Sequence, residues 1–302
     1  GPGALREALA GARCQEILSY AFVDPSVAEA LAPGAPLVRL ANPLSADLSV
    51  LRPSLWPGLV KAWLANRHRQ RTRARLFELG RVFTPAAEAG QGEGERVAGL
   101  LAGPRAPEGW ANDAAVHDFF DLRGVVERLL AVTREAAAFR FERGEHPVLH
   151  PGQTARVLRE TASGTVEVGC LGRIHPAVQA ALDLPEPVFL FELDRDALLA
   201  RGAPVHRALS RFPQVRRDIA LELDAGVEAG RVLELARAAG GELVADVLLF
   251  DVYAGDRLPE GRRSLALGVI MRADRTLQDE EAAATVERIV TRLEHEFGAL
   301  RR

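Results

Sequence analysis

The chain has 302 residues, of which 48% are hydrophobic and 26% charged, and a formal net charge of −3. This is the composition of an ordinary soluble globular protein with room for two domains, and it excludes nucleic-acid binding through bulk positive charge. The apolar runs are too short for a transmembrane helix, so no membrane partner is expected. The two cysteines, Cys14 and Cys170, show no metal or disulfide spacing, which favours a cytoplasmic location.

The N-terminus reads Gly1-Pro2-Gly3, without an initiating Met. It also lacks the charged segment and the apolar segment that together make a signal peptide. Such a start would arise from a tag remnant or from a fragment of a longer protein, and the motifs described below favour the fragment.

Up to about residue 204 the pattern mixes helices with more numerous strands. Apolar residues recur at helical spacing over residues 5–18 and 55–69, and Asp118 is placed to cap a helix that runs to about Leu130. Few strand–helix pairs repeat, which predicts a mainly antiparallel α+β sheet. Strands are expected at residues 19–23, 75–83, 95–103, 155–159, 165–172 and 188–193.

A domain boundary is expected at Arg201-Gly202-Ala203-Pro204, between a helix-like run and the turn-rich Phe212-Pro213. It separates a domain of residues 1–204 from a domain of residues 210–302. The second domain reads strand, helix, strand, strand, helix and a very short strand. This β-α-β-β-α-β order predicts a ferredoxin-like sandwich with both helices on one face of the sheet and the other face open.

Some features of the first domain suggest chemistry but favour structural roles. The glycine-rich Gly90–Gly94 segment resembles a phosphate loop, yet acidic residues flank it and a strand follows, so we interpret it as a solvated hairpin loop. His146, His150 and His175 are each followed by Pro and match no zinc spacing with the nearby cysteine, so no metal site is predicted. Without a nucleophile elbow or a convincing Cys and His pair, no catalytic residue is predicted either.

The second domain carries a candidate RNA surface. From Ser210 onward there are 14 Arg against 17 Asp and Glu, so any RNA site must be a local patch. The small residues Ser264, Ala266 and Gly268 alternate on the predicted third strand, where a base could lie flat against an open sheet face. Tyr253 is the nearest aromatic residue, and arginine forks suit phosphates. The alternative is that these arginines are ordinary solubilising residues.

Several segments of the second domain stand out, in order: Arg211-Phe212-Pro213-Gln214-Val215-Arg216-Arg217-Asp218-Ile219-Ala220, Phe250-Asp251-Val252-Tyr253-Ala254-Gly255, Gly261-Arg262-Arg263-Ser264-Leu265-Ala266-Leu267, Arg275-Thr276-Leu277-Gln278-Asp279-Glu280-Glu281 and Phe297-Gly298-Ala299-Leu300-Arg301. Together they resemble the ferredoxin-fold anticodon-binding domain of the phenylalanyl-tRNA synthetase family. Because separate motifs match in the same order over the whole domain, the resemblance is specific.

Segments of the first domain are similar to the region just upstream in the β subunit of the same family: Gln15-Glu16-Ile17, Ser19-Tyr20-Ala21-Phe22, Asn42-Pro43-Leu44-Ser45, Leu51-Arg52-Pro53-Ser54-Leu55, Phe77-Glu78-Leu79-Gly80-Arg81-Val82-Phe83, Asp118-Phe119-Phe120-Asp121-Leu122, His150-Pro151-Gly152 and Gly169-Cys170-Leu171-Gly172-Arg173-Ile174-His175-Pro176. The resemblance implies that residues 1–204 form a class II synthetase-like antiparallel sheet domain that does not catalyse. The family's upstream oligonucleotide-binding-like, editing and helical-wing domains have no counterpart in this sequence. We therefore expect a C-terminal fragment of the β subunit.

The sequence itself argues against ATP binding in the first domain. A class II site needs an Arg after the Phe77–Phe83 strand, but Thr84-Pro85 follow. Residues 188–193 contain no glycine that would let a nucleotide approach the backbone, although Arg195 stands near the position of the second ATP-binding Arg. We expect no cofactor in this fragment, while the resemblance implies that the whole enzyme uses ATP and Mg²⁺.

The resemblance further implies a partner. The segment from Asn42 to Trp63 matches the motif that builds the dimer interface of class II enzymes, and Trp and Arg are favoured interface anchors. We expect it to pack on the catalytic α subunit of an α2β2 enzyme, with the alternative that Trp56 and Trp63 are simply core. The predicted interface residues are Leu51, Arg52, Leu55, Trp56, Leu59 and Trp63.

As a whole, the resemblance implies a non-catalytic part of phenylalanine–tRNA ligase that binds the tRNA(Phe) anticodon. Acidic residues would accept hydrogen bonds from a guanine edge, and arginines would hold phosphates. The alternative is a paralogue that serves only assembly and no longer binds RNA, which the salt dependence of tRNA binding would separate. The predicted RNA-binding residues are Arg216, Arg217, Asp246, Asp251, Tyr253, Arg262, Ser264, Ala266, Gly268 and Arg301.

Overall fold

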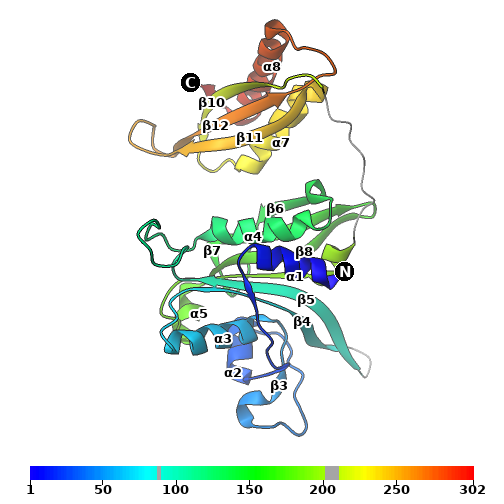
Figure 1. Cartoon of the computed structure of the whole chain (residues 1–302), viewed down its shortest axis with the longest axis vertical. Helices are drawn as coiled ribbons and strands as arrows, with labels where there is room; N and C mark the ends of the chain where they lie inside the picture. The colour runs from blue at the N-terminus through cyan, green and yellow to red at the C-terminus, as the bar shows by residue number, and fades with distance from the viewer. Residues whose placement is uncertain (87–89, 201–210) are drawn as a thin grey trace. The chain divides into compact units, whose positions relative to one another are not determined.

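A computed structural model describes residues 1–86, 90–200 and 211–302. The chain divides into two compact units, Gly1–Pro204 and Val205–Arg302, which we call the first and second unit (Figure 1). The boundary predicted at Arg201-Gly202-Ala203-Pro204 lies outside the described residues.

The first unit is built on one sheet in the order β1-β4-β5-β9-β8-β7-β6. Only the β1–β4 pair is parallel among its described strand pairs, so the expected antiparallel α+β fold is confirmed. The strands are β1 (Gln15–Glu16), β4 (Ala74–Ala86), β5 (Gly90–Ala102), β6 (Phe139–Arg143), β7 (Leu149–Thr161), β8 (Gly164–Ile174) and β9 (Val188–Asp194). A separate antiparallel pair joins β2 (Phe22–Val23) to β3 (Val50–Leu51).

Helices cover both faces of the large sheet (Figure 1). Phe189, Phe191 and Leu193 of β9 belong to a core with α1 and α4, whereas Val188 and Leu190 belong to a core with α3. A strand buried on both faces reads as a continuous apolar run, which is why residues 188–193 lack polar alternation. The helices are α1 (Pro2–Gly11), α2 (Pro25–Leu31), α3 (Trp56–His68), α4 (Phe119–Ala131), α5 (Pro176–Ala181) and α6 (Arg195–Leu199), with single turns at Ala46–Leu48 and Ala136–Ala138.

Most elements of the first unit lie where the sequence predicts them, with three corrections. The helix predicted over residues 5–18 ends at Gly11, because Arg13 adopts a φ of 59° and turns the chain into β1. The strand predicted over 19–23 contains only Phe22–Val23. The predicted loop at Gly90–Gly94 is wrong, since its backbone pairs with residues 82–86 as part of β5.

Local hydrogen bonds explain two other features of the sequence. Asp118 caps α4 as predicted, because its carboxylate accepts from the N–H of Asp121 at 2.9 Å while Asp121 accepts from the N–H of Asp118 at 3.0 Å. The Nδ1 atoms of His146, His150 and His175 each accept a backbone N–H two residues later. These contacts support the structural interpretation of the three histidines.

Glu192 of β9 lies next to the start of α3, and its carboxylate accepts the N–H of Leu55 at 2.7 Å. Burial raises the pKa of Glu192 to about 7, and neither this hydrogen bond nor the nearby Arg96 and Arg52 offset that effect. The folded chain therefore holds a proton on Glu192 between about pH 4.5 and pH 7 that the unfolded chain releases.

We expect Glu192→Gln to raise the free energy of unfolding of the first unit increasingly with pH. Below about pH 4.5 the side chain at position 192 is neutral in both the unsubstituted protein and the variant, so the substitution removes no charge. Above pH 7 the unsubstituted protein has to ionise a desolvated carboxyl in its folded state, which costs about 3 kcal/mol. Urea unfolding followed by tryptophan fluorescence measures this, since all three tryptophans lie before residue 204. A difference between the two chains that stays constant from about pH 5 to pH 8 would contradict it.

The second unit is a four-stranded antiparallel sheet in the order β11-β12-β10-β13. Ile219, Leu221 and Leu223 of β10 pack with α7 and α8 on one face, so the expected ferredoxin-like order is confirmed. Gly298, in the left-handed region, ends α8 as predicted. The elements are β10 (Val215–Asp224), α7 (Ala229–Gly240), a single turn at Gly241–Leu243, β11 (Val244–Tyr253), β12 (Arg262–Met271), α8 (Asp279–Phe297) and β13 (Leu300–Arg301). Across the described residues, the chain has no helix with the length and apolarity of a membrane span.

Candidate nucleic-acid interface

The sheet of the second unit leaves one face uncovered by the helices, and strand register identifies its residues. Leu265, Leu267, Val269 and Met271 of β12 are buried in the helix-side core, so the alternate residues of β12 point the other way. Their partners on β10 and β11 share that side. We define the open face as Arg216, Asp218, Ala220, Glu222, Asp246, Leu248, Phe250, Asp251, Tyr253, Arg262, Ser264, Ala266, Gly268 and Ile270.

A β-bulge decides which part of β11 reaches the open face. Leu249 is opposite Leu267, but the next paired residue is Asp251, opposite Ala266, so Phe250 is the extra residue. A bulge shifts the alternation by one residue, so Leu248 before it and Asp251 after it lie on the same side. This explains why both faces of β11 carry apolar residues in the sequence.

Arg216 lies flat across the open face. Its Nε donates to Asp218 at 2.7 Å, and its guanidinium carbon lies 4.9 Å from the centre of the Phe250 ring. A Cβ added to Gly268 would approach the Arg216 Nε to 3.0 Å, so the absence of a side chain at Gly268 makes room for the arginine. The Arg216 guanidinium therefore lies over the Phe250 ring, and the pair offers a cationic and aromatic stack that a base can extend.

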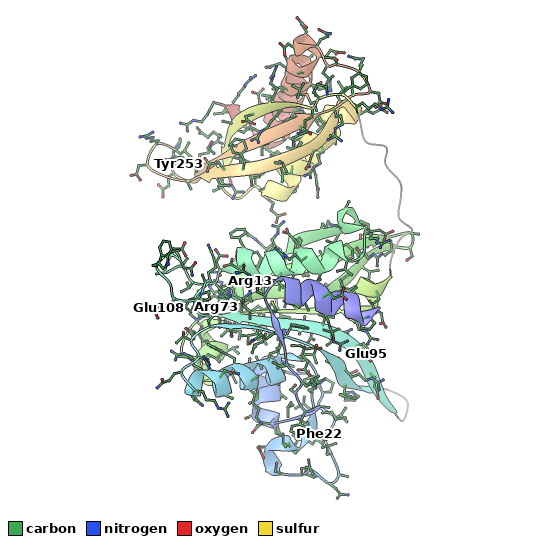
Figure 2. The ribbon with its side chains drawn as sticks, in the orientation of Figure 1. Arg13, Phe22, Arg73, Glu95, Glu108 and Tyr253 are labelled. Atoms are coloured by element: carbon green, nitrogen blue, oxygen red, sulfur yellow. The ribbon has the colours of Figure 1, made fainter. Side chains whose placement is uncertain are left out.

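Exposed apolar side chains of β11 lie beside a row of small residues on the open face. Phe250 is 51% exposed, Leu248 42% and Tyr253 39%, which is high for aromatic and aliphatic residues of a sheet. Tyr253 lies at the end of β11, beside the hairpin loop (Figure 2). Next to them, Ala220 and Ala266 are direct neighbours on β10 and β12. The exposed rings offer the stacking surfaces that single-stranded RNA bases need.

The open face carries two arginines and four carboxylates, so it is acidic rather than basic. Glu222 accepts from Arg262 at 3.2 Å, and Asp246 from Arg237 of α7 at 3.2 Å. No described side chain forms an ion pair or hydrogen bond with the exposed Asp251 carboxylate. Such a carboxylate is suited to accept hydrogen bonds from the amino and imino groups of a base, and unsuited to phosphate.

Two of the predicted RNA-binding arginines are not part of this surface. Arg217 points to the helix side and pairs with Asp279 of α8 at 2.6 Å. Arg301 is opposite Leu221 on that same side and pairs with Glu287 of α8. The structure thus brings Arg216 and Arg262 together with the predicted β11 and β12 residues, and separates Arg217 and Arg301 from them.

Sequence reasoning missed Phe250, Leu248 and Asp218. Phe250 stands inside a segment that the resemblance highlighted, but regular alternation would have placed it and Asp251 on opposite sides of the strand. The exposed aromatic residue before Asp251 was the available signal, and only the bulge shows that both residues belong to one surface.

The residues predicted as the subunit interface of the first unit are buried within its fold. All six predicted residues are at most 7% exposed, and Leu55, Leu59 and Trp63 are fully buried. Trp56 donates its indole N–H to the Phe191 carbonyl at 3.2 Å, while Arg52 binds Glu78. Burial of this degree favours the alternative that Trp56 and Trp63 are core. The residues concerned are Leu51, Arg52, Leu55, Trp56, Leu59 and Trp63.

Around β5 and β9 of the first unit, the described side chains are packed against one another. Phe191 fills the space above Gly99, where an added Cβ would overlap its ring, and both faces of the sheet are packed with helices. Arg195, near the expected position of an ATP-binding Arg, pairs instead with Glu95 at 2.9 Å and Asp196 at 3.3 Å. A nucleotide would have to displace a close-packed core to reach the strands.

Two known families match this chain, one in each compact unit. Residues 3–195 match the family described as phenylalanyl tRNA synthetase beta chain CLM domain, and residues 210–302 match the ferredoxin-fold anticodon binding domain. A phenylalanine–tRNA ligase beta subunit of Pseudomonas fluorescens is 44% identical over 297 residues, 98% of this chain and 37% of the relative. The corresponding subunit of Vibrio cholerae is 38% identical over 298 residues, with the same coverage. A solved pyrrolysyl-tRNA synthetase of Desulfitobacterium hafniense aligns at a TM-score of 0.48 and 17% identity over 66% of each chain.

The chain therefore spans 37% of the length of the two curated relatives described. The first family match ends at residue 195 and the second begins at residue 210. The boundary between the two compact units, after Pro204, lies between these two positions. The open face described above lies wholly within the part matched by the anticodon-binding family.

Proposed function

Because the chain belongs to the phenylalanyl-tRNA synthetase beta chain family, we propose that it is part of the β subunit of a phenylalanine–tRNA ligase and that residues 210–302 bind the anticodon of tRNA(Phe). The observation that carries the proposal is the open face itself. It combines stacking surfaces at Phe250 and Tyr253 with an exposed carboxylate at Asp251, and it lies in the part of the chain matched by an anticodon-binding family.

Recognition would take place by stacking and by hydrogen bonds to base edges. One base would stack on Phe250 and the Arg216 guanidinium, and another on Tyr253. Asp251 would accept from the N1–H and the exocyclic amino group of a guanine, a pair of donors that adenine does not present together. Ser264, Ala266 and Ala220 would leave room for the bases, while Arg262 at the edge would contact phosphate.

The whole enzyme would use ATP to charge tRNA(Phe) with phenylalanine in the cytoplasm, and the chemistry would take place on an α subunit in an α2β2 assembly. The packing of the first unit supports this division of work, because described side chains fill the space around β5 and β9. The partner would contact surface residues other than those buried around α3. Exposed apolar residues of the first unit that are free to do so are Leu18, Tyr20, Leu44 and Trp110.

A second candidate function is an assembly paralogue that has lost RNA binding, for which the acidic balance of the open face is the supporting observation. Titration of labelled tRNA(Phe) with the chain at increasing salt separates the two. RNA binding through phosphates weakens steeply with salt, whereas an assembly module shows no saturable binding at any salt concentration. Co-purification with an α subunit is expected under both functions.

We expect Asp251→Ala and Ser264→Arg to raise the KM for tRNA(Phe) of the assembled enzyme roughly 5- to 100-fold with little change in kcat. The first removes the base-edge acceptor, worth about 1–3 kcal/mol of discrimination, and the second fills the floor of the open face. Asp274→Ala, an exposed carboxylate outside the open face, is the matched control. An unchanged KM for tRNA(Phe) in both variants would show that the open face is not the anticodon site.

A further inference from the structure

A cleft of about 410 Å³ on the first unit gathers arginines from segments far apart in the sequence. It lies where the residues after α1, the start of β4, the residues after β5 and helix α4 meet. Because these segments are spread from residue 11 to residue 128, the fold and not a local basic run creates the cluster. The lining arginines are Arg13, Arg73, Arg75, Arg105 and Arg128.

Most of the charge in this arginine cleft is uncompensated. Arg105 pairs with Asp121 at 3.0 Å and with Asp118 at 3.1 Å. Across residues 1–86, 90–200 and 211–302, the other four arginines form no ion pair, although many arginines elsewhere in the chain do. Burial and the like charges of Arg75 and Arg13 lower the pKa of Arg73. Clustered positive charge of this kind opposes folding unless an anion relieves it.

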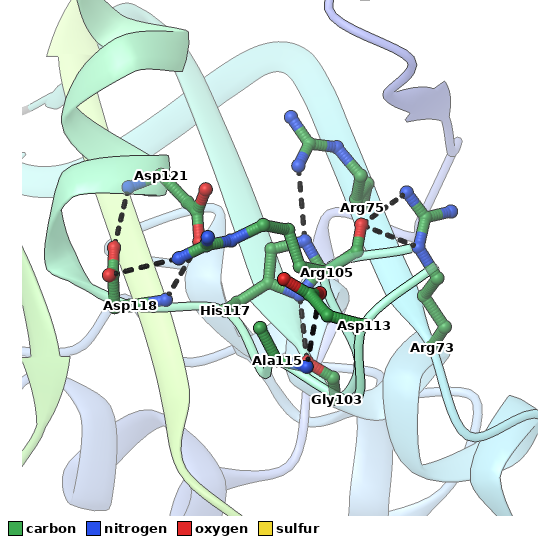
Figure 3. A network of polar contacts seen from close by, with 9 residues as sticks. All are labelled: Arg73, Arg75, Gly103, Arg105, Asp113, Ala115, His117, Asp118 and Asp121. Atoms are coloured by element: carbon green, nitrogen blue, oxygen red, sulfur yellow. Dashed lines mark hydrogen bonds and ion pairs between the residues drawn. The ribbon is translucent and has the colours of Figure 1, made fainter. Parts of the chain in front are cut away.

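Neutral acceptors hold the arginines in place without cancelling their charge (Figure 3). The Arg75 Nη2 donates to the carbonyl of Ala12 at 2.9 Å, and Nη1 lies 3.0 Å from the Nε2 of His117. His117 is buried, and burial lowers its pKa, so the neutral ring donates from Nδ1 to the Gly103 carbonyl at 2.9 Å and accepts at Nε2.

Arg73 and Arg128 are fixed in the same way. Arg73 donates from Nε and Nη2 to the carbonyl of Arg105, both at 3.3 Å, and Arg128 donates from Nη1 to the carbonyl of Gly11 at 3.2 Å. The remaining guanidinium donors stay available. Positioned donors with retained charge are what an anion site requires, because little rotamer freedom is lost on binding.

The cleft is also open and has an aromatic rim. Phe120, at the start of α4, lines it and is 71% exposed. Gly124 lies one turn further along α4, and a Cβ added there would meet nothing within 4 Å. A glycine inside a helix is less stable than alanine, and no packing contact requires this one. It keeps the floor of the cleft clear.

From these contacts we propose that the arginine cleft binds the phosphodiester backbone of an RNA strand. Arg73, Arg75 and Arg128 contact phosphates, and Phe120 stacks on a neighbouring base. The spread of the arginines around an open cleft, together with the exposed ring, fits a nucleotide chain better than a single small phosphate. That the RNA is a tRNA rests on the proposed function.

The test uses the full chain and a fluorescent tRNA(Phe) transcript from which the anticodon arm has been deleted, so that the open face has no ligand. Arg73→Gln combined with Arg128→Gln should weaken binding about tenfold at about 0.1 M salt, and should reduce the slope of log K against log salt by roughly 1.4 to 1.8. The matched control is Arg6→Gln combined with Arg123→Gln. It removes two charges from α1 and α4 that pair with Glu16 and Glu127 outside the cleft, and is expected to bind like the native chain.

A second pair of variants excludes misfolding as the cause. Gly124→Glu places a carboxylate on the cleft floor while improving the helix, so it should weaken binding about tenfold and raise the Tm. Gly124→Gln has the same size without the charge, and should raise the Tm while weakening binding much less.

Equal binding by the cleft variants and the control variant, or no binding of the armless transcript by the native chain, would overturn the inference. Displacement of the RNA by submillimolar inorganic phosphate at constant ionic strength would overturn it too, in favour of a small-anion site. Phe250→Ala measured with intact tRNA(Phe) keeps the two proposals apart. If Phe250→Ala binds normally while the cleft variants do not, the anticodon assignment fails and the cleft stands.

Discussion

Replacing Arg52 by Met is expected to lower the free energy of unfolding of the first unit by about 3 to 5 kcal/mol. Arg52 is 5% exposed, and its Nη1 donates to Glu78 at 2.7 Å and to the hydroxyl of Ser19 at 3.0 Å. Its Nε donates to the carbonyl of Arg81 at 2.8 Å. Removing the guanidinium leaves the 2% exposed Glu78 carboxylate inside the fold without its counter-ion.

The geometry around this ion pair explains the size of the effect. Gly80 lies against the Arg52 guanidinium and Gly58 against Ser19 and Glu78, and an added Cβ at either position would overlap them. The charged pair is therefore enclosed by backbone, and water cannot enter to solvate the remaining carboxylate. A buried partner that loses its counter-ion costs far more than an exposed one.

Urea unfolding followed by tryptophan fluorescence gives the measurement, since the second unit contains no Trp. Arg67→Met is the matched control: Arg67 pairs with Glu186 at 3.2 Å, but the two side chains are 34% and 24% exposed, so a loss below about 1 kcal/mol is expected. If Arg52→Met were as stable as the control and only lost association with an α subunit, the interface predicted from the sequence would be right and the core assignment wrong.

Replacing Phe250 by Ala is expected to weaken tRNA(Phe) binding by about 1–3 kcal/mol, or roughly 5- to 150-fold in Kd. The substitution removes the exposed ring on which a base would stack. It also removes the ring over which the Arg216 guanidinium lies, at 4.9 Å from the ring centre. Because Phe250 is 51% exposed and lies outside the helix-side core, the stability of the second unit should change little.

Filter binding or anisotropy with intact tRNA(Phe) measures this effect, and circular dichroism of the same samples checks the fold. Tyr20→Ala is the control, because Tyr20 is 71% exposed on the first unit and lies outside both the open face and the arginine cleft. A Kd for Phe250→Ala equal to that of the control would show that no base stacks on this ring.

The two proposed RNA surfaces divide recognition between them. The open face is acidic and has exposed rings, which suits reading of bases, whereas the arginine cleft has uncompensated charge, which suits the backbone. A chain with a net charge of −3 can bind RNA only if its positive charge is gathered locally. Salt dependence should therefore reside mainly in the cleft, and base preference in the open face.

Much of the fold could be predicted because local pattern and tertiary packing agree. Alternation in Ile219, Leu221 and Leu223 identified the buried face of β10, and helical spacing at Leu59 and Trp63 identified α3. The α4 cap at Asp118 was equally clear. Each of these elements buries one apolar side, so apolar residues recur in the sequence at the spacing of a helix or a strand.

The sites were harder to predict, for physical reasons. Strand alternation cannot reveal the extra residue at Phe250, which places Asp251 on the same side as Leu248. The partner of Arg52 is Glu78, 26 residues away, so sequence could not tell a buried ion pair from an interface anchor. The arginine cleft could not be predicted, because its arginines are spread from Arg13 to Arg128 in the sequence and only the folded chain brings them together.

The central claim, that the open face reads the anticodon, is tested most directly by a double-mutant cycle on a short RNA. The Kd of the native chain and of Asp251→Ala would be measured for the anticodon stem–loop of tRNA(Phe), with the anticodon guanine or with adenine in its place. The account predicts that the native chain prefers guanine by about 5-fold or more and that Asp251→Ala loses this preference. Equal affinity of the native chain for the two stem–loops would contradict it.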